Sequence, residues 1–365
     1  MHYQLERTYG CRISDAWTYR GLKTVVIENE LVRITVLVDK GADIYEFVHK
    51  PTDTDFMWRT PWGVRDPSKW VPTSGWGNGL WHDVYEGGWQ TIAPTGGGPM
   101  NYMGAELGQH NESAIMPWDC QVLEDTPERV SAKFWVRTYR TPFWIEKTLS
   151  LEKGSAVLTI EETVLNEAEE PAECVWGQHI ALGAPFLSTA CRLDVPAGSR
   201  FFVPRDDDEE QGGEHRLKAG LTGSFPDAAD PAGKPVDLST FPAKSARLAD
   251  YCVISEMPEG WYAVTNRERG VGFAFSYPKE TYPYLWFWQV FGGGKGWPWY
   301  RRNYNVGLEP FSSLGNGKPE PGSKKRTAFI MKAGERRTIT MRATAYESKT
   351  GVTRVSNLGK PTFRR

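Results

Sequence analysis

His179 lies in the middle of an otherwise apolar segment, VWGQHIALGAPFL (175–187), where a packing strand more often carries a branched apolar residue. Alternate residues of a strand share a face, so His179 shares its face with Gly177 and Ala181. These small neighbours leave a space over the sheet that a ligand, or a large side chain from elsewhere, could fill. The pattern fits a working histidine as well as a core histidine whose hydrogen bonds are satisfied.

Glu309 repeats this arrangement in the segment NYNVGLEPFSS (303–313), where it shares a face with Gly307 while Val306 and Leu308 lie on the other face. A buried carboxylate is costly unless it is hydrogen bonded or paired, and desolvation raises its pKa toward the range of a general base. Backbone amides could equally hold such a carboxylate. His179 and Glu309 are therefore candidates for proton transfer.

Two further histidines lie among aromatic and glycine residues. His110 stands in the polar cluster GQHNES beside Glu112, and His82 stands in LWHDVYEGGW. Together with His179 and Glu309 they could in principle ligate a metal ion, but the spacing matches no HxH or HExxH motif. We expect neither a metal nor a cofactor, because acid–base chemistry needs only the side chains.

Aromatic residues are unusually common, with 16 Trp, 15 Tyr and 16 Phe. Many stand beside glycine and proline, as in TSGWGNGLWHDVYEGGW and GGGKGWPWYRRNY. Aromatic side chains in loops can be lids over a core or flat platforms for ligands with apolar faces, of which sugar rings are one kind.

The elements that must position these residues are strands. Short runs with a period of two, rich in Val, Ile, Thr and aromatic residues, recur along the chain and are bounded by Gly, Pro, Asn and Asp. This pattern predicts an all-β fold, a large antiparallel β-sandwich with few short helices. The clearest runs are 24–30, 31–39, 42–50, 129–140, 143–152, 156–167, 173–182, 251–257, 262–268, 271–277, 284–291, 305–311, 326–334 and 337–347.

Residues 1–365 are expected to form a single domain, with an acidic, Pro/Gly-rich surface excursion at 205–243 that begins RDDDEEQGGEH. The formal net charge of −2 gives no reason to expect a nucleic acid or a membrane as partner. Five cysteines without CxxC spacing, and no apolar leader or span, favour a cytoplasmic protein. The chain has no GxSxG elbow, phosphate loop or dinucleotide fingerprint.

The order of several motifs resembles the aldose 1-epimerase (galactose mutarotase) superfamily, in a branch of aldose-1-epimerase-like proteins of unassigned substrate. The resemblance spans roughly residues 25–346, and its motifs are ENELVRITVLVDKGADIYEFVHKPTDTDFMW, GQHNES, FWIEKTLSLEKGSAVLTIEETVLNE, WGQHIALGAPFL and NVGLEPFSS. It implies a β-sandwich in which His179 is the general acid, Glu309 is the general base and His110 binds substrate. The family's usual Asn-Arg pair is not visible, and the turn reads His-Asn-Glu where the family has His-Gly-Glu, which separates this chain from ordinary galactose mutarotases.

The resemblance implies that Glu309 takes a proton from the anomeric hydroxyl while protonated His179 donates one to the ring oxygen. We therefore expect an isomerase that interconverts the anomers of a free sugar or sugar derivative, as a monomer or homodimer. Isomerisation or elimination on an oxidised sugar, and carbohydrate binding without catalysis, are the alternatives. The residues expected to contact the sugar are His110, Glu112, His82, Trp89, Gln178, Trp288, Gln289 and Arg301, the last by pairing with an anionic group.

Overall fold

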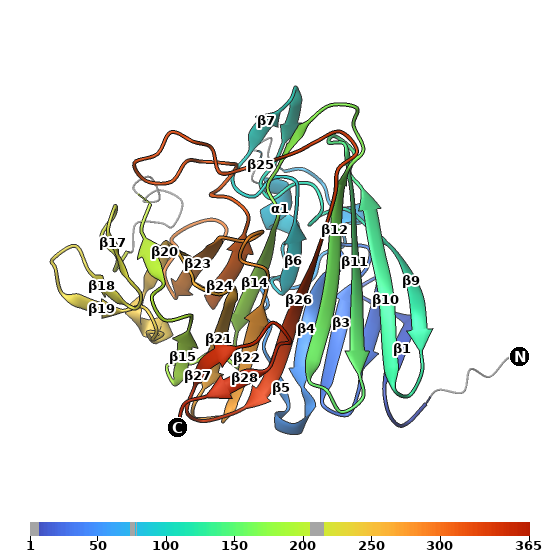
Figure 1. Ribbon diagram of the computed structural model, residues 1–365, viewed down its shortest axis with the longest axis horizontal. Helices are drawn as coiled ribbons and strands as arrows, with labels where there is room; N and C mark the ends of the chain where they lie inside the picture. The colour runs from blue at the N-terminus through green and yellow to red at the C-terminus, as the bar shows by residue number, and fades with distance from the viewer. Residues whose placement is uncertain (1–6, 74–76, 78, 205–214) are drawn as a thin grey trace, which may run out of the picture.

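The alternating segments fold as strands because each has one face that must be removed from water. The structure, a computed structural model, describes residues 7–73, 77, 79–204 and 215–365. Within that part of the chain most strands belong to two antiparallel sheets, which Figure 1 shows as two layers. The predicted all-β sandwich is confirmed.

The larger sheet carries the segments that contain His179 and Glu309. Neighbours in this sheet follow the order β1 (Arg12–Tyr19), β2 (Leu22–Glu28), β3 (Val32–Leu37), β4 (Asp43–His49), β6 (Trp89–Ile92), β14 (Gly177–Gly183), β24 (Tyr304–Phe311), β23 (Tyr284–Phe291), β20 (Leu248–Ser255), β16 (Arg200–Phe202) and β17 (Thr222–Ser224), while β5 (Thr54–Asp55) pairs with β4.

The second sheet covers one face of the first. Its order is β15 (Cys191–Asp194), β21 (Trp261–Asn266), β22 (Val271–Ser276), β26 (Arg336–Glu347), β12 (Val157–Asn166), β11 (Phe143–Glu152), β10 (Arg129–Arg137) and β9 (Asp119–Asp125). The main hydrophobic core lies between the sheets and includes Ile180 and Leu182 of β14 and Phe273 and Phe275 of β22. Burial of such side chains contributes roughly 1.5–3 kcal/mol each.

Small elements complete the described chain. Four two-stranded ribbons are β7 (Met100–Tyr102) with β8 (Ala105–Leu107), β13 (Ala172–Cys174) with β25 (Phe329–Met331), β18 (Asp227–Ala229) with β19 (Pro235–Asp237), and β27 (Val352–Val355) with β28 (Pro361–Phe363). The short helices are α1 (Gly79–Val84), η1 (Lys50–Thr52), η2 (Pro67–Lys69) and η3 (Lys244–Ala246). None of the helices in the described ranges is long and apolar enough to cross a membrane.

Two expectations differ in detail from the structure. The run at 173–182 is not one strand, because β13 pairs with β25 and the chain then crosses to the larger sheet, where β14 begins at Gly177. The start of the acidic excursion, 205–214, lies outside the described residues. The rest of the excursion supplies β17 to the larger sheet and the β18–β19 ribbon beside it (Figure 1).

Candidate functional site

His179 and Glu309 meet across two neighbouring strands. In the antiparallel pairing of β14 with β24, Gly177 lies opposite Phe311 and Ala181 opposite Gly307, so His179 faces Glu309. The distance from Nε2 of His179 to Oε1 of Glu309 is 3.4 Å, and each residue is only 3% exposed. The structure thus brings together the two residues that the sequence nominated for proton transfer.

Burial sets the resting protonation of this pair. Desolvation lowers the pKa of His179 from 6.5 to about 3 and raises the pKa of Glu309 well above its ordinary value. Both shifts favour the uncharged forms, so one proton resides on Glu309 and the imidazole is neutral. The expected resting state, an ionised Glu309 beside a protonated His179, is therefore not the one that this closed environment favours.

The space expected beside His179 is filled by side chains. A Cβ atom on Gly177 would lie 2.2 Å from the ring of Phe311, and one on Gly183 would lie 2.5 Å from the ring of Trp58. Contacts this short are not tolerated, so glycine is required at both positions for the neighbouring aromatic rings to pack. The small residues make room for large side chains, Phe311 of β24 and Trp58 of the segment that follows β5.

His110 joins the pair, as the resemblance implied. Its ring lies 5.4 Å from that of His179, and the ring of Trp81 on α1 packs edge-on against both, at 4.6 Å from His110 and 5.5 Å from His179. The hydroxyl of Tyr85 lies 3.4 Å from Nδ1 of His179. Burial lowers the pKa of His110 well below its ordinary value, so a second neutral imidazole faces the site.

Further aromatic rings cover the His179–Glu309 pair. We define the aromatic cover as Trp58, Trp62, Trp81, Tyr85, Trp288 and Trp299, whose rings contact one another in pairs. Trp288 comes within 6.0 Å of His179, and His82 packs against Trp81 at 4.9 Å and Trp299 at 5.6 Å. Trp288 therefore lies beside the pair and His82 beside its aromatic cover, and their contact with a sugar stays a prediction.

A buried polar chain, which the sequence did not reveal, holds Trp81. The indole nitrogen of Trp81 donates to Oε1 of Gln90 at 3.0 Å, and Nε2 of Gln90 donates to Asp43 at 2.7 Å. Asp43 and Glu86 both pair with Nζ of Lys40, at 2.5 and 2.7 Å, and Lys40 is fully buried. Burial raises the pKa of Glu86 well above its ordinary value, which leaves Lys40 and Asp43 as the ion pair.

The register between the strands explains why the buried polar chain reaches the His179–Glu309 pair. Gln90 lies opposite His179 and Trp286 lies opposite Glu309, so these four residues form one row across β6, β14, β24 and β23. The only signal in the sequence was a lysine inside VDKGAD, which resembles an ordinary exposed turn.

Three of the residues expected to bind substrate face away from the pair. Trp89 donates to Gln178 at 2.8 Å, and Gln178 donates to Glu162 at 2.9 Å, between the two sheets. Gln289 accepts from Arg216 at 2.6 Å, on the face opposite that of Trp288. Each of the three is adjacent in sequence to a residue that faces the site: Trp89 to Gln90, Gln178 to His179 and Gln289 to Trp288. Adjacent residues of a strand point to opposite faces, so these three point away from the site.

Glu112 and Arg301 lie outside the pair as well. One carboxylate oxygen of Glu112 accepts from the backbone amides of Tyr139 and Arg140, both at 2.9 Å, and the other accepts from Thr141 at 2.7 Å. Glu112 thus holds a turn. Arg301 lies between β23 and β24, where its amide donates to the carbonyl of Gly294 at 2.9 Å.

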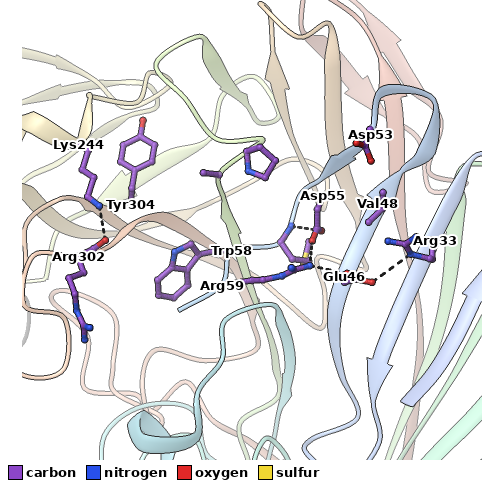
Figure 2. Close-up of a pocket in the computed structure, with 13 residues that line it drawn as sticks. Arg33, Glu46, Val48, Asp53, Asp55, Trp58, Arg59, Lys244, Arg302 and Tyr304 are labelled. Carbon is purple, nitrogen blue, oxygen red and sulfur yellow. Dashed lines mark hydrogen bonds and ion pairs between the residues drawn. The ribbon is translucent and has the colours of Figure 1, made fainter. Parts of the chain in front are cut away.

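A cavity of about 440 Å³ lies beside the aromatic cover, where β14 ends and β24 begins (Figure 2). His179 and Glu309 do not line it, but Trp58 does, and the Trp58 ring also packs 5.9 Å from Tyr85. Its charged lining residues are Arg33, Glu46, Asp53, Asp55, Arg59, Lys244 and Arg302. Trp58 is therefore shared between this cavity and the cover of the candidate pair.

Within the described ranges no three His, Cys, Asp or Glu side chains are grouped closely enough to hold a metal ion. The chemistry that the pair offers is proton transfer between one imidazole and one carboxyl group, both packed against aromatic rings.

Residues 19–220 match the family model described as "Domain of unknown function (DUF4432)". No curated protein sequence matches the chain.

Solved structures share its architecture. A candidate aldose 1-epimerase from Klebsiella pneumoniae is 16% identical, with 93% of this chain and 84% of that chain covered and a TM-score of 0.70. A galactose mutarotase related enzyme from Lactobacillus acidophilus is 16% identical, with 89% and 98% covered and a TM-score of 0.59. A galactose mutarotase-like protein from Clostridium acetobutylicum is 12% identical, with 93% and 99% covered and a TM-score of 0.59. At these identities the likeness establishes the fold.

Proposed function

The chain belongs to the family described as "Domain of unknown function (DUF4432)" and has the fold of galactose mutarotase-like proteins; from that premise we propose that it interconverts the anomers of a free sugar or sugar derivative. The observation that carries this proposal is the buried His179–Glu309 contact of 3.4 Å, which places a proton donor and a proton acceptor side by side. The anomeric hydroxyl and the ring oxygen are bonded to the same carbon, so the two groups that serve them must lie only a few ångströms apart.

For this reaction His179 and Glu309 must share one proton. When sugar hydroxyl groups replace apolar surroundings, the ionised form becomes accessible, with the proton on His179 and the charge on Glu309. Glu309 then takes the proton of the anomeric hydroxyl while His179 gives its proton to the ring oxygen, and the ring opens. Rotation about the C1–C2 bond and reversal of both transfers close the ring as the other anomer.

After ring opening, Glu309 carries a proton and His179 is neutral, which is the protonation that burial favours in the ligand-free protein. The open-chain state is thus matched to the electrostatics of the site. Positioned acid–base groups of this kind contribute about 10²–10⁴-fold in rate. His110 and the aromatic cover would contact the sugar, and part of that cover has to move to admit it.

The test is anomer exchange followed by one-dimensional NMR, above the spontaneous rate, across neutral aldoses and their uronic acids. Wild type is compared with Glu309→Gln and His179→Asn, and with Glu347→Gln, whose carboxylate is 63% exposed, as the matched control. We expect the control to behave as wild type and both site variants to lose at least 100-fold.

If no sugar equilibrates faster with wild type than with Glu309→Gln, anomer interconversion is ruled out. Consumption of a uronic acid without anomer exchange would instead favour isomerisation or elimination on an oxidised sugar. Tight binding without either reaction would favour a binding protein.

A further inference from the structure

Two asparagine side chains on the face of Glu309 are buried without partners. Asn303 and Asn305 are both fully buried, and none of the amide oxygens or nitrogens of their side chains finds a hydrogen-bond partner among the residues that the structure describes. An unsatisfied buried amide is expensive and uncommon in folded proteins. Two of them within three residues point to a ligand that supplies the missing hydrogen bonds.

Their position follows from the strand register. Alternation along β24 puts Asn305, Gly307 and Glu309 on one face, and Asn303 lies one residue before the strand begins. The Glu309 carboxylate leans back over Gly307, because a Cβ atom there would lie 2.1 Å from Oε1. Two residues of a strand span about 7 Å, so Asn305 begins about one sugar ring away from the carboxylate, and Asn303 one step further.

The surroundings suit a sugar ring lying along this row. Trp288 lies opposite Gly307 in β23, and its indole would come within 3.2 Å of a Cβ atom there, so an aromatic edge flanks the stretch between carboxylate and amide. Gly183 lies opposite Asn305 in β14, and Trp58 of the aromatic cover occupies the space over it, so a sugar that reaches Asn305 takes the place of the Trp58 ring. Part of the row is therefore aromatic and part is polar, as a pyranose requires.

We propose that Asn305, with Asn303 beyond it, binds the hydroxyl groups of the sugar that are remote from the anomeric carbon. This inference rests on the proposed function, since it sets the anomeric carbon at His179 and Glu309 and the far end of the ring at Asn305. An amide offers both a donor and an acceptor, which matches a hydroxyl group; a carboxylate group would leave the amide oxygen unpaired. The site thus selects an aldose that carries hydroxyl groups at C4 and C6.

The first test is stability without ligand. Asn305→Leu replaces the amide by an apolar group of similar size, so we expect a higher Tm than wild type. Asn29→Leu is the matched control, because the Asn29 amide donates to the carbonyls of Glu152 and Ser155 and accepts from the amides of Leu31 and Val32. The control should have a lower Tm. A fall in Tm for Asn305→Leu as large as the control's would show that Asn305 has a structural role, and would overturn the inference.

The second test is binding, measured by calorimetry in a Glu309→Gln background so that turnover does not interfere. The probes are D-galactose, D-glucose and their 4-deoxy and 6-deoxy analogues. Asn305→Leu should weaken binding of a parent sugar at least 10-fold, because a sugar hydroxyl is then buried unpaired. It should leave the affinity for one of the deoxy analogues nearly unchanged.

The outcomes separate the two proposals. Asn305→Leu that binds and anomerises like wild type overturns the inference and leaves the proposed function standing. Loss of binding in Asn305→Leu, in a protein that anomerises no sugar, supports the inference and overturns the proposed function. A Glu309→Gln protein that binds none of the probes overturns the inference and leaves the proposed function to the anomer-exchange test.

Discussion

The carboxylate oxygen Oε1 of Glu309 occupies the space in which a side chain on Gly307 would begin, since a Cβ atom there would lie 2.1 Å from it. The carboxylate is the far end of a flexible side chain, so Gly307→Ala should push it aside at little cost to folding. A displacement of about 1 Å can reduce the rate of a positioned reaction by about 100-fold. We expect a loss of this order in anomer exchange, with Tm within a few degrees of wild type.

Gly98→Ala is the control for that substitution, because nothing lies within 4 Å of a Cβ atom at Gly98. It should retain full activity. Equal activity in Gly307→Ala and wild type would show that the position of the Glu309 carboxylate does not matter, which contradicts its role as the base.

The burial of His179 predicts a specific acid lability. Its pKa in the folded chain is lowered from 6.5 to about 3, so below pH 6.5 the unfolded chain takes up a proton that the folded chain does not. The stability that His179 contributes is therefore complete above pH 6.5 and is lost as pH falls toward 3. At about 1.4 kcal/mol per pKa unit, the free energy of unfolding of wild type should fall by up to about 5 kcal/mol relative to His179→Asn across that window. Guanidinium titrations at pH 7 and pH 4.5 measure about half of this difference.

The contribution of Glu309 to the free energy of unfolding should change with pH in the opposite direction, and Glu309→Gln tests this in the same titrations. The pKa of Glu309 is raised in the folded chain, so its contribution is complete below its ordinary value and is lost as pH rises through the folded value. Glu309→Gln should therefore gain stability relative to wild type as pH increases above 4.5. Parallel pH profiles for wild type and both variants would mean that neither residue is desolvated in solution.

Lys40 should be one of the most sensitive positions in the chain. Lys40→Met leaves Asp43 and Glu86 buried without their cation, and breaking a buried pair in this way costs about 3–5 kcal/mol. Lys69→Met, whose lysine is 73% exposed in its pair with Asp66, should change the free energy of unfolding by less than about 0.5 kcal/mol.

A double variant refines this prediction. Adding Asp43→Asn to Lys40→Met removes the carboxylate that has lost its cation and should recover part of the loss. If urea denaturation places Lys40→Met within about 1 kcal/mol of wild type, the Lys40–Asp43–Glu86 cluster is not the desolvated assembly that the geometry describes.

Much of the site could be predicted from local sequence by the alternation of faces along a strand. The wrong assignments arise where that alternation was not applied. Strand alternation predicted that His179 shares a face with Gly177, and Glu309 with Gly307, as the structure has it. The same alternation, applied strictly, puts Gln178 on the face opposite His179, yet it was grouped with the substrate contacts. The prediction that Gln289 contacts the substrate is wrong for the same reason, because Gln289 is adjacent to Trp288 and points to the opposite face.

What local sequence could not supply is the register between strands that are far apart in the chain. Nothing in VWGQHIALGAPFL specifies that its neighbours are Gln90 on one side and Glu309 on the other; the resemblance, and not the spacing, paired the histidine with the glutamate. Lys40 was missed because burial of a charge depends on partners from other segments. Asn303 and Asn305 were visible as polar residues on the face of Glu309, but only the packed structure shows that their amides lack partners.

The pairing of β14 with β24 also constrains how the chain reaches its folded state. The segment matched by the family model ends at residue 220, so it contains His179 but not the strand that supplies Glu309. A nascent chain of that length has one edge of β14 unpaired, and such edges template association with other chains. Contacts between segments this distant give a high contact order, which is typical of β-proteins that fold in milliseconds to seconds. The His179–Glu309 pair is thus among the last features to assemble during synthesis.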